Sequence, residues 1–478
     1  MMNDMILILD GSQEYGMEIA RRLRAEQIYA RVAPLRMAQE SVCQSGLRGV
    51  ILCGGGGDET LCETIAALET PVLALGEAAY TLLRALGGAN AGVAMSEKKA
   101  LVTYEKSALF TGVADGERFF KEAQTLMLPA DIAETASAGG CTIAFEETEK
   151  KKYGVQFELE RNDPEGSSIL TNFVLDICGC ARTWTLETAL EQAEAMLRNA
   201  AAQGGRAVCA VGGGVDSALC ALLAHRAFGE RMTAIFVDTG LMREGEAADV
   251  QASLEALGIP VRCVDRSGEI LESLMHRRAM EDKHAVVVDR LYEEMLRQSA
   301  SIEGEKTLVL GTNYDDFLHS GSDADTWRES GMTVIEPLMG LMKDEVRAVG
   351  RMLGMSEAIV DRKPFPALGL GARIVGEVTG ERLHALRTAE RIFRSEIEQA
   401  GLERRLYKHF PVLIGDEKLG SALMVLRAVT LSGAQLVPAR LPYDLVERTV
   451  AQILLQLPMI TRVLYDQTPS QIGQESFY

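Results

Sequence analysis

Short apolar runs alternate along the first part of the chain with segments whose apolar residues recur at helical spacing. The runs are MILILD at 5–10, GVILCG at 49–54 and PVLALG at 71–76, and helical patterns at 16–26 and 58–69 separate them. Such runs, joined by helices, are typical of parallel strands buried on both faces. The pattern weakens between residues 100 and 150, where charged and small residues dominate, and resumes near residue 150. We therefore predict a parallel sheet wound with helices, closed by a helix within residues 165–182.

A second alternating series follows a helical segment at residues 185–202. Its apolar runs lie at 206–211, 232–238, 260–265 and 306–312, again with helical patterns between them. Beyond residue 380 the pattern changes to one long helix, 381–401, and then to mixed strands and helices. A chain of 478 residues is too long for one hydrophobic core. The predicted fold class is α/β, with two doubly wound parallel-sheet domains, 1–182 and 186–378, and a small α+β domain, 379–478.

Net charge and hydropathy exclude two classes of partner. The formal charge of −19 repels a nucleic-acid backbone, and no cluster of Lys and Arg offsets it. No uncharged apolar stretch reaches the roughly 18 residues needed to span a bilayer, so we expect a cytoplasmic protein without a membrane partner. A small phosphorylated ligand remains compatible with the charge, because one glycine-rich loop can hold it.

One glycine-rich loop has the composition of a phosphate site. The run 206–211 leads directly into Gly212, Gly213, Gly214, Val215, Asp216 and Ser217, and a helical pattern follows. Consecutive glycines let backbone N–H groups converge on an anion, and the helix N-terminus adds partial positive charge. Asp216 could hold Mg²⁺, and Ser217 could donate a hydrogen bond to a phosphate oxygen. The alternative is a tight turn in which Asp216 or Ser217 only caps the helix.

This loop resembles the S-G-G-x-D-S signature of the ATP pyrophosphatases. Segments 236–246, 308–320, 334–350 and 362–383 are similar, in order, to the motifs of the glutamine-hydrolysing GMP synthase family. VLRAV at 425–429, ARLPYDLVER at 439–448 and TRVLYD at 461–466 resemble that family's dimerisation domain. With GSQ near the start and YGVQF near residue 155, the resemblance covers essentially the whole chain.

The resemblance implies a two-part reaction that uses ATP and Mg²⁺. A class I glutaminase releases ammonia, while the pyrophosphatase domain adenylates O2 of xanthosine monophosphate so that ammonia can displace AMP. On this basis the 212–217 loop binds pyrophosphate and metal, with Asp216, Ser217 and Lys343 as the catalytic residues. Further nucleotide contacts are expected at Asp238, Gly240, Arg243, Gly311 and Thr312, and acceptor contacts at Lys283 and His284. For Arg243 and Lys343 an ordinary surface charge is the alternative. A homodimer formed through the C-terminal domain is implied as well.

The glutaminase half departs from the family at its catalytic positions. Gly76 stands where the family's nucleophilic cysteine lies, and Glu158-Leu159-Glu160 replaces its H-P-E, so only the glutamate remains. All six histidines lie between His225 and His409, so no Cys-His pair can form in the first domain. Cys53 and Cys62 do not match the nucleophile position and are interpreted as structural thiols, since an activated thiol needs a base or a positive field. We predict that this half does not hydrolyse glutamine.

The synthase half departs from the family mainly at the acceptor site. Gly212 replaces the first serine of the loop, which should weaken pyrophosphate binding by about 1 kcal/mol. His284 stands where an arginine binds xanthosine monophosphate, and the lysine-rich lid has become the acidic segment 321–331, which contains Asp323 and Asp325. Ser470 and Ser476 replace a C-terminal lysine and glutamate. Weak binding of xanthosine monophosphate is expected.

Three functional hypotheses remain open. The first is an ATP-dependent ligase that aminates a small nucleotide, either xanthosine monophosphate or another acceptor, with ammonia or another amine. The second is a non-catalytic relative that keeps the fold and the dimer as a nucleotide-binding or regulatory module. The third, new chemistry at Glu158 and Glu160, is weakened because alternating residues of a strand face opposite sides. The retained Asp216 and Ser217 favour the first hypothesis.

Overall fold

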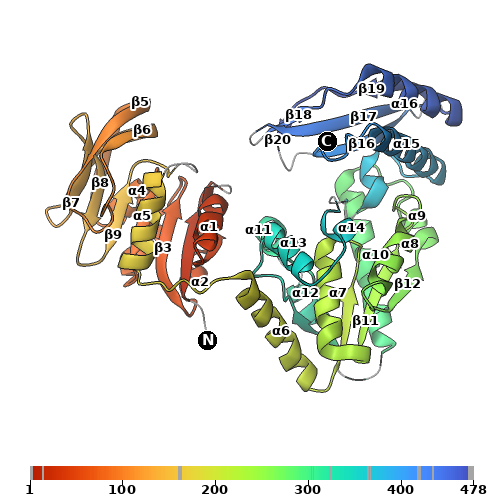
Figure 1. Ribbon diagram of the computed structural model, residues 1–478, viewed down its shortest axis with the longest axis horizontal. Helices are drawn as coiled ribbons and strands as arrows, with labels where there is room; N and C mark the ends of the chain where they lie inside the picture. Colours follow the sequence, from red (N-terminus) through yellow and green to blue (C-terminus); the bar gives the residue numbers. More distant parts are fainter. Residues whose placement is uncertain are drawn as a thin grey trace. The chain divides into compact units, whose positions relative to one another are not determined.

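The computed structural model describes residues 4–12, 15–159, 164–302, 304, 306–321, 324–362, 365, 368–416, 421–432 and 435–471. The chain divides into two compact units, Met1–Ala189 and Leu190–Tyr478 (Figure 1). The predicted α/β class, with parallel sheets wound by helices and a final α+β region, is confirmed. The three domain boundaries placed from sequence stay a prediction.

The first unit is built on a nine-stranded sheet whose first five strands are parallel. In spatial order the strands are β2 (Tyr29–Pro34), β1 (Met5–Asp10), β3 (Leu47–Cys53), β4 (Val72–Leu75), β9 (Lys152–Val155), β8 (Cys141–Glu147), β7 (Ala133–Ala138), β5 (Ala89–Tyr104) and β6 (Gly116–Met127). Every residue of β1, β4 and β9 is buried. Burial on both faces is the reason that the apolar runs are continuous rather than alternating.

Five helices accompany this sheet. They are α1 (Tyr15–Ala25), α2 (Ala38–Ser41), α3 (Glu59–Ala67), α4 (Ala78–Ala85) and α5 (Pro164–Thr171), which continues into a π-helical turn, Asn172–Ile177. Apolar residues of β1, β3 and β4 pack with those of α3 and α4 in one buried cluster. This packing holds the carboxyl end of β4 against the start of α4.

The region between residues 89 and 147 is more regular than the sequence indicated. β5 and β6 pair antiparallel over most of their length, and β7 and β8 continue the sheet. The β5–β6 pairing shifts register between Asn90 and Val93 and between Val93 and Met95. Side chains such as Leu101 and Phe119 are exposed. Val102 and Phe120, which neighbour these two residues, are buried, so one face of the pair is covered. The register shifts, together with apolar side chains on the solvated face, hide the strands from a hydrophobic-pattern search.

The second unit contains a parallel five-stranded sheet. Its spatial order is β12 (Val261–Asp265), β11 (Met232–Asp238), β10 (Arg206–Ala210), β13 (Lys306–Val309) and β14 (Thr333–Ile335). The helices of this region are α6 (Leu186–Ala202), α7 (Val215–Phe228), α8 (Glu246–Glu255), α9 (Ser267–Ser273), α10 (Met280–Ala300), α11 (Tyr314–Ser320), α12 (Ala324–Glu329), α13 (Lys343–Met352) and α14 (Glu357–Val360). Four strands match predicted runs, and the short β14 was not predicted.

A six-stranded sheet occupies the C-terminal part of the same unit. It is ordered β15 (Ile374–Val375), β16 (Lys408–Asp416), β17 (Ser421–Ser432), β18 (Gln435–Pro438) and β20 (Ser470–Gln471), with β19 (Ile460–Tyr465) paired to β17. Two helices, α15 (Gly380–Gln399) and α16 (Tyr443–Gln456), pack together beside it (Figure 1). Most of its pairings are antiparallel.

One hydrophobic core joins this sheet to the region around the parallel sheet. Leu241, after β11, and Leu274, after α9, belong to the same buried cluster as Leu386 of α15 and Leu426 of β17. The cluster fixes α15 beside the loop that follows β11, and that loop carries several of the expected nucleotide contacts. In the described part of the chain, no helix combines the length and the apolar character that crossing a membrane requires.

Candidate functional site

The glycine-rich loop forms a tight connection between β10 and α7. Gly213 adopts a left-handed conformation with φ of +81°, which favours glycine, and Gly214 is the N-cap of α7. The Ser217 hydroxyl accepts a hydrogen bond from the Gly212 N–H and donates one to the Gly214 carbonyl, both at 3.2 Å. Ser217 thus closes the loop on itself, while α7 has no side-chain cap at its N-terminus, and the contact of Ser217 with phosphate stays a prediction.

Asp216 is the centre of a polar cluster beside this loop. Its carboxylate forms an ion pair with the Lys343 ammonium, at the start of α13, and accepts a hydrogen bond from Asn313 Nδ2 at 3.0 Å. Gly311 lies so close that an added Cβ would sit 3.1 Å from the Ser217 nitrogen. The backbone after β13 is therefore packed directly against the phosphate loop, and the sequence-predicted residues Asp216, Lys343 and Gly311 lie together.

A second carboxylate shares the Asn313 amide. Asn313 Nδ2 also donates to Asp316 Oδ2 at 2.6 Å, and the side chain of Asn313 is fully buried. Desolvation, together with the nearby charge of Asp216, raises the pKa of Asp316. Two repelling carboxylates at the mouth of a glycine loop fit a divalent cation, since Mg²⁺ is commonly held by one or two carboxylates plus phosphate oxygens. Among the residues that are described, no group of three or more acidic, Cys or His side chains could hold a metal by itself.

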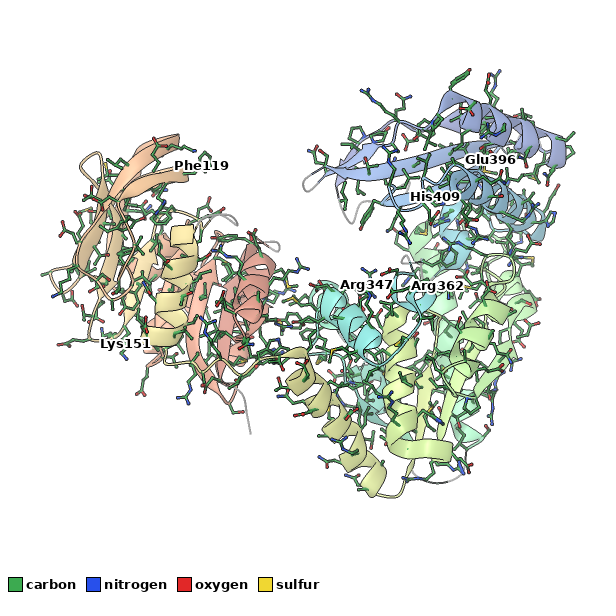
Figure 2. The ribbon with its side chains drawn as sticks, in the orientation of Figure 1. Phe119, Lys151, Arg347, Arg362, Glu396 and His409 are labelled. Atoms are coloured by element: carbon green, nitrogen blue, oxygen red, sulfur yellow. The ribbon has the colours of Figure 1, made fainter. Side chains whose placement is uncertain are left out.

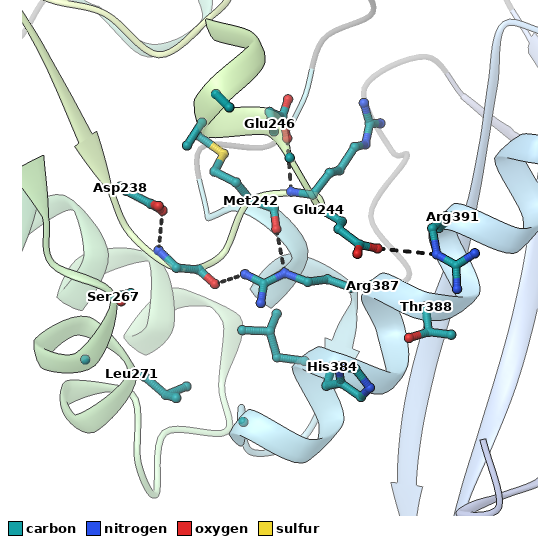
Figure 3. Close-up of a pocket in the computed structure, with 18 residues that line it drawn as sticks. Asp238, Met242, Glu244, Glu246, Ser267, Leu271, His384, Arg387, Thr388 and Arg391 are labelled. Carbon is teal, nitrogen blue, oxygen red and sulfur yellow. Dashed lines mark hydrogen bonds and ion pairs between the residues drawn. The ribbon is translucent and has the colours of Figure 1, made fainter. Parts of the chain in front are cut away.

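The residues after β11 border a cavity of about 780 Å³ (Figure 3). Asp238 Oδ1 accepts a hydrogen bond from the Gly240 N–H at 2.8 Å, which makes the turn. Arg387 of α15 donates to the carbonyl of Gly240 and, at 2.8 Å, to that of Met242. Asp238 and Gly240 thus both line a cavity, as expected of nucleotide contacts, and Arg387 holds their loop in place.

Arg243 stands between this cavity and a second one of about 910 Å³. Its guanidinium pairs with Glu390 at 2.9 Å and lies 4.5 Å from the centre of the Phe365 ring. Arg373 pairs with the same glutamate at 3.0 Å. Glu390 is buried, so each arginine neutralises part of a desolvated charge. Arg243 is therefore not an ordinary surface charge.

The second cavity is rich in cationic side chains. Two of its lining residues, Arg362 and His409, are labelled in Figure 2. Burial and the neighbouring Arg373 lower the pKa of Lys408 to about 8. The cations that line the cavity are Arg243, Arg362, Arg373, Arg394, Arg404 and Lys408, together with His409, and the acids are Glu357, Asp361, Glu398 and Glu403. The lining cations outnumber the lining acids, although Arg243 and Arg373 already pair with Glu390 and Arg362 pairs with Glu246.

The expected acceptor contacts lie elsewhere. Lys283, on α10, is fully buried, and its ammonium donates to the Ile374 carbonyl at 2.8 Å. That side chain serves the packing of α10 against β15 and has no surface from which to contact a ligand in this conformation. His284 is exposed on the same helix, and neither residue is among those that line the two cavities described above. Thr312 is partly buried and lines neither cavity.

The C-terminal replacements are only partly within the described residues. Ser470, at the start of β20, accepts a hydrogen bond from Arg427 at 2.8 Å. Asp325 is exposed on α12 and pairs with Arg328. Asp323, Ser476 and Glu160 lie outside the described residues.

A glycine occupies the turn between β4 and α4 in the first unit, where the sequence predicted the nucleophile position. Gly76 follows β4 with φ of +60°, and its N–H donates to the Val155 carbonyl at 2.8 Å. A Cβ on Gly76 would lie 3.3 Å from Glu158 Cγ. Glu158 therefore faces the empty nucleophile position, where the family's histidine would stand. A carboxylate there has no thiol to activate.

Neither candidate thiol replaces the missing nucleophile. Cys53 is fully buried at the end of β3, and its burial, with Asp10 and Glu158 nearby, raises the pKa of the thiol. A thiol with a raised pKa carries little thiolate at neutral pH. Cys62 is partly buried on α3, and its thiol lies 3.6 Å from the Thr81 carbonyl.

Four residues of the site were not anticipated from the sequence. Asn313 joins two carboxylates, Glu246 and Arg362 bind the loops around the second cavity, and Arg387 holds the loop after β11. Asn313 follows Gly311 and Thr312 directly, and Arg362 begins a segment that resembles a family motif. These positions in the sequence could have pointed to Asn313 and Arg362. No such signal marks Glu246 and Arg387, because their contacts depend on the tertiary fold.

Comparisons with known proteins match both the second unit and the whole chain. A family model described as NAD synthase matches residues 189–376. The chain is 34% identical to a GMP synthase (glutamine-hydrolyzing) of Geobacillus kaustophilus, over 98% of each chain. The chain is also 33% identical to a GMP synthase (glutamine-hydrolyzing) of Acetivibrio thermocellus and 34% identical to one of Symbiobacterium thermophilum, again over 98% of each chain.

Proposed function

The chain belongs to the GMP synthase family, and from that premise we propose that it is an ATP-dependent C–N ligase that uses ammonia rather than glutamine. It would adenylate a carbonyl oxygen of a purine nucleotide, either xanthosine monophosphate or a related acceptor, and release pyrophosphate. Ammonia would then displace AMP. The observation that carries the proposal is the cluster of Asp216, Lys343 and Asn313 against the glycine loop.

The proposed chemistry assigns each part of this cluster a task. The acceptor oxygen attacks the α-phosphorus of ATP, the bond to the β-phosphate oxygen breaks, and pyrophosphate leaves. Backbone N–H groups at the start of α7 would stabilise the charge that develops on the departing pyrophosphate. Lys343 would place a positive charge at the same phosphates, and Asp216 and Asp316 would hold Mg²⁺. When bound, Mg²⁺ neutralises phosphate charge and so favours pyrophosphate departure.

The cation-rich cavity supports an anionic acceptor next to the ATP site. Arg362 lines this cavity and donates to the Gly213 carbonyl at 3.0 Å, so the cavity borders the phosphate loop. Arg373 and Lys408 would attract a nucleotide phosphate. We therefore propose this cavity, rather than the region of Lys283 and His284 on α10, for the acceptor.

We propose free ammonia as the amine because the first unit lacks the side chains that hydrolyse glutamine. Gly76 offers no thiol, Glu158 faces its position, and no histidine is present in residues 1–189. A cytoplasmic location and a homodimer formed through the C-terminal domain are further parts of this proposal. Analytical ultracentrifugation tests the dimer, which would have twice the chain mass of 51.9 kDa.

A non-catalytic nucleotide-binding relative is the second candidate. It is favoured by the degenerate first unit and by the acidic segment around Asp325, where the family has a lysine-rich lid. The Asp216–Lys343 pair favours the ligase. An ion pair that only stabilised the fold could form anywhere, whereas this pair lies beside a glycine-rich loop of the kind that binds phosphate.

Release of pyrophosphate tests the choice between the two. The full chain is incubated with ATP, Mg²⁺ and a panel of purine nucleotides, with ammonium or glutamine as the nitrogen source. The proposal expects that pyrophosphate is released only when an acceptor and ammonium are both present. Glutamine in place of ammonium should not support the release, and Asp216→Ala should abolish it. ATP binding with no pyrophosphate released for any acceptor would favour the binding module.

A further inference from the structure

Arg362 connects the phosphate loop to the cation-rich cavity through two contacts. Its Nη1 donates to the Gly213 carbonyl at 3.0 Å, and its Nη2 forms an ion pair with Glu246. Gly213 and Glu246 are buried, and the Arg362 side chain is 22% exposed. A guanidinium has five N–H donors in a rigid plane, so it can hold both partners at once, which a lysine cannot do with the same geometry.

The contact with Gly213 determines how the phosphate loop presents its backbone. In a trans peptide, the carbonyl of one residue and the N–H of the next point in opposite directions. Because Arg362 holds the Gly213 carbonyl on its own side, the Gly214 N–H is turned away from Arg362. Gly214 is the N-cap of α7, where unpaired N–H groups gather. Glycines rotate at little steric cost, so without this contact the peptide would have other orientations available.

Glu246 extends the connection to the loop after β11. Its Oε2 accepts a hydrogen bond from the Arg243 N–H at 3.0 Å, while Oε1 pairs with Arg362. The Arg243 side chain in turn pairs with Glu390. Arg362 thus belongs to a chain of buried contacts that runs from Gly213 to α15.

We propose that Arg362 is a positioning residue that fixes the peptide between Gly213 and Gly214 for the phosphates of ATP. The inference rests on the proposed function, because it takes the 212–217 loop as the phosphate site. It assigns to Arg362 an effect on phosphate binding, exerted through Gly213 and without any requirement that Arg362 contact ATP. Adenosine, which has no phosphate, should be unaffected.

Binding measurements on matched variants test this role. Arg362→Lys keeps a cation beside Glu246 but loses the simultaneous contact with Gly213. Arg297→Lys is the control, because it makes the same change at an exposed arginine of α10 that pairs with Glu294 and lines neither cavity. Isothermal titration calorimetry, in the presence of Mg²⁺, measures the affinity of each variant for inorganic pyrophosphate, ATP and adenosine. Arg362→Lys should bind pyrophosphate and ATP on the order of tenfold more weakly, as expected for one lost charge-assisted hydrogen bond, and adenosine normally. Arg297→Lys should bind all three as wild type does.

The outcomes separate this inference from the proposed function. Wild-type affinity of Arg362→Lys for pyrophosphate would overturn the inference alone. Equal losses for pyrophosphate and adenosine would also overturn it, since they would indicate a general disturbance of the unit. Failure of the wild-type chain to bind ATP with Mg²⁺ would overturn the proposed function and the inference together. Thermal unfolding of each variant is measured alongside, and Arg362→Lys should keep the wild-type Tm because its charge beside Glu246 is retained.

Discussion

Gly76 and Glu158 face each other at the carboxyl edge of the first sheet, where a Cβ on Gly76 would lie 3.3 Å from Glu158 Cγ. The left-handed φ of Gly76 is the conformation in which a nucleophile turn holds its residue. The scaffold therefore keeps the arrangement of a nucleophile and its partner while both side chains have changed. We predict from this arrangement that the unit keeps its fold but does not hydrolyse glutamine.

Glutamine should not support turnover, because the first unit has neither a thiol at position 76 nor a base to activate one. Gly76→Cys alone should remain inactive, since the Glu158 carboxylate would raise the pKa of the new thiol. Gly76→Cys with Glu158→His should release glutamate slowly but measurably. The measurement is glutamate formed per mole of enzyme over time.

The glutamine prediction has internal controls among the existing cysteines. Cys53→Ala and Cys62→Ala should leave ammonium-dependent activity unchanged. Glutamate release by the wild-type chain, lost in Cys62→Ala, would show that a different thiol has taken over the reaction.

Binding of ATP should depend on both members of the Asp216–Lys343 pair. Asp216→Ala removes a carboxylate for Mg²⁺ and leaves the ammonium of Lys343 without its partner, and Lys343→Met removes the positive charge. Each should weaken binding of ATP with Mg²⁺ by roughly 10- to 100-fold, from charge-assisted contacts of about 1.5–3 kcal/mol. Calorimetry measures the affinity. Asp344→Ala, on the exposed side of the same helix turn, is the control and should bind normally.

Much of this site could be predicted from the sequence. The strand, glycine loop and helix predicted a phosphate site at 212–217, and motif order predicted that Lys343 belongs with it. Asp216 and Lys343 are far apart in the sequence, but Asp216 follows β10 and Lys343 follows β14. Strands β10, β13 and β14 are successive parallel neighbours in the sheet, so their carboxyl ends share one edge.

The remaining features depend on packing that no local pattern encodes. A lysine in a polar helical segment predicts an exposed side chain, yet Lys283 is fully buried because α10 packs against β15. Arg362 begins a recognisable segment, but its contact with Gly213 arises only once the chain returns to the phosphate loop. The position of such residues is determined by the tertiary fold.

Burial of Lys283 should make stability depend on pH in a specific direction. Burial lowers its pKa in the folded chain from 10.5 to about 8. Below about pH 8 both states hold the proton and the cost of burying the charge is fully present. Between about pH 8 and 10.5 the unfolded chain binds more protons than the folded chain, so stability rises with pH. Relative to Lys283→Met, the wild-type Tm should therefore increase as pH rises from 7 to about 9.5.

The comparison is made by thermal unfolding of the two proteins across that range, so that alkaline effects common to both cancel. Exposed Lys106→Met is the control and should follow the wild-type curve at every pH. A constant difference between wild type and Lys283→Met would contradict the prediction.

Xanthosine monophosphate should bind far more weakly to this chain than to a site with arginine at position 284 and lysine at position 470. Binding of ATP should be normal. A nucleotide monophosphate carries nearly two negative charges, and His284 stands where the family has an arginine. Ser470, in place of a lysine, accepts a hydrogen bond from Arg427. Losing two charge-assisted contacts of about 1.5 kcal/mol each predicts at least a hundredfold loss of affinity.

Restoring the cations one at a time separates the two positions. His284→Arg adds a guanidinium on the exposed face of α10, and a recovery of about tenfold in affinity would place the acceptor at α10 rather than in the cation-rich cavity, which His284 does not line. Ser470→Lys should recover less, because its ammonium would lie beside Arg427, and like charges repel at that distance. Titration calorimetry on the wild-type chain and both variants provides the test. Low-micromolar binding of xanthosine monophosphate by the wild-type chain would contradict the prediction, because it would show that the replaced cations are not needed to hold this nucleotide.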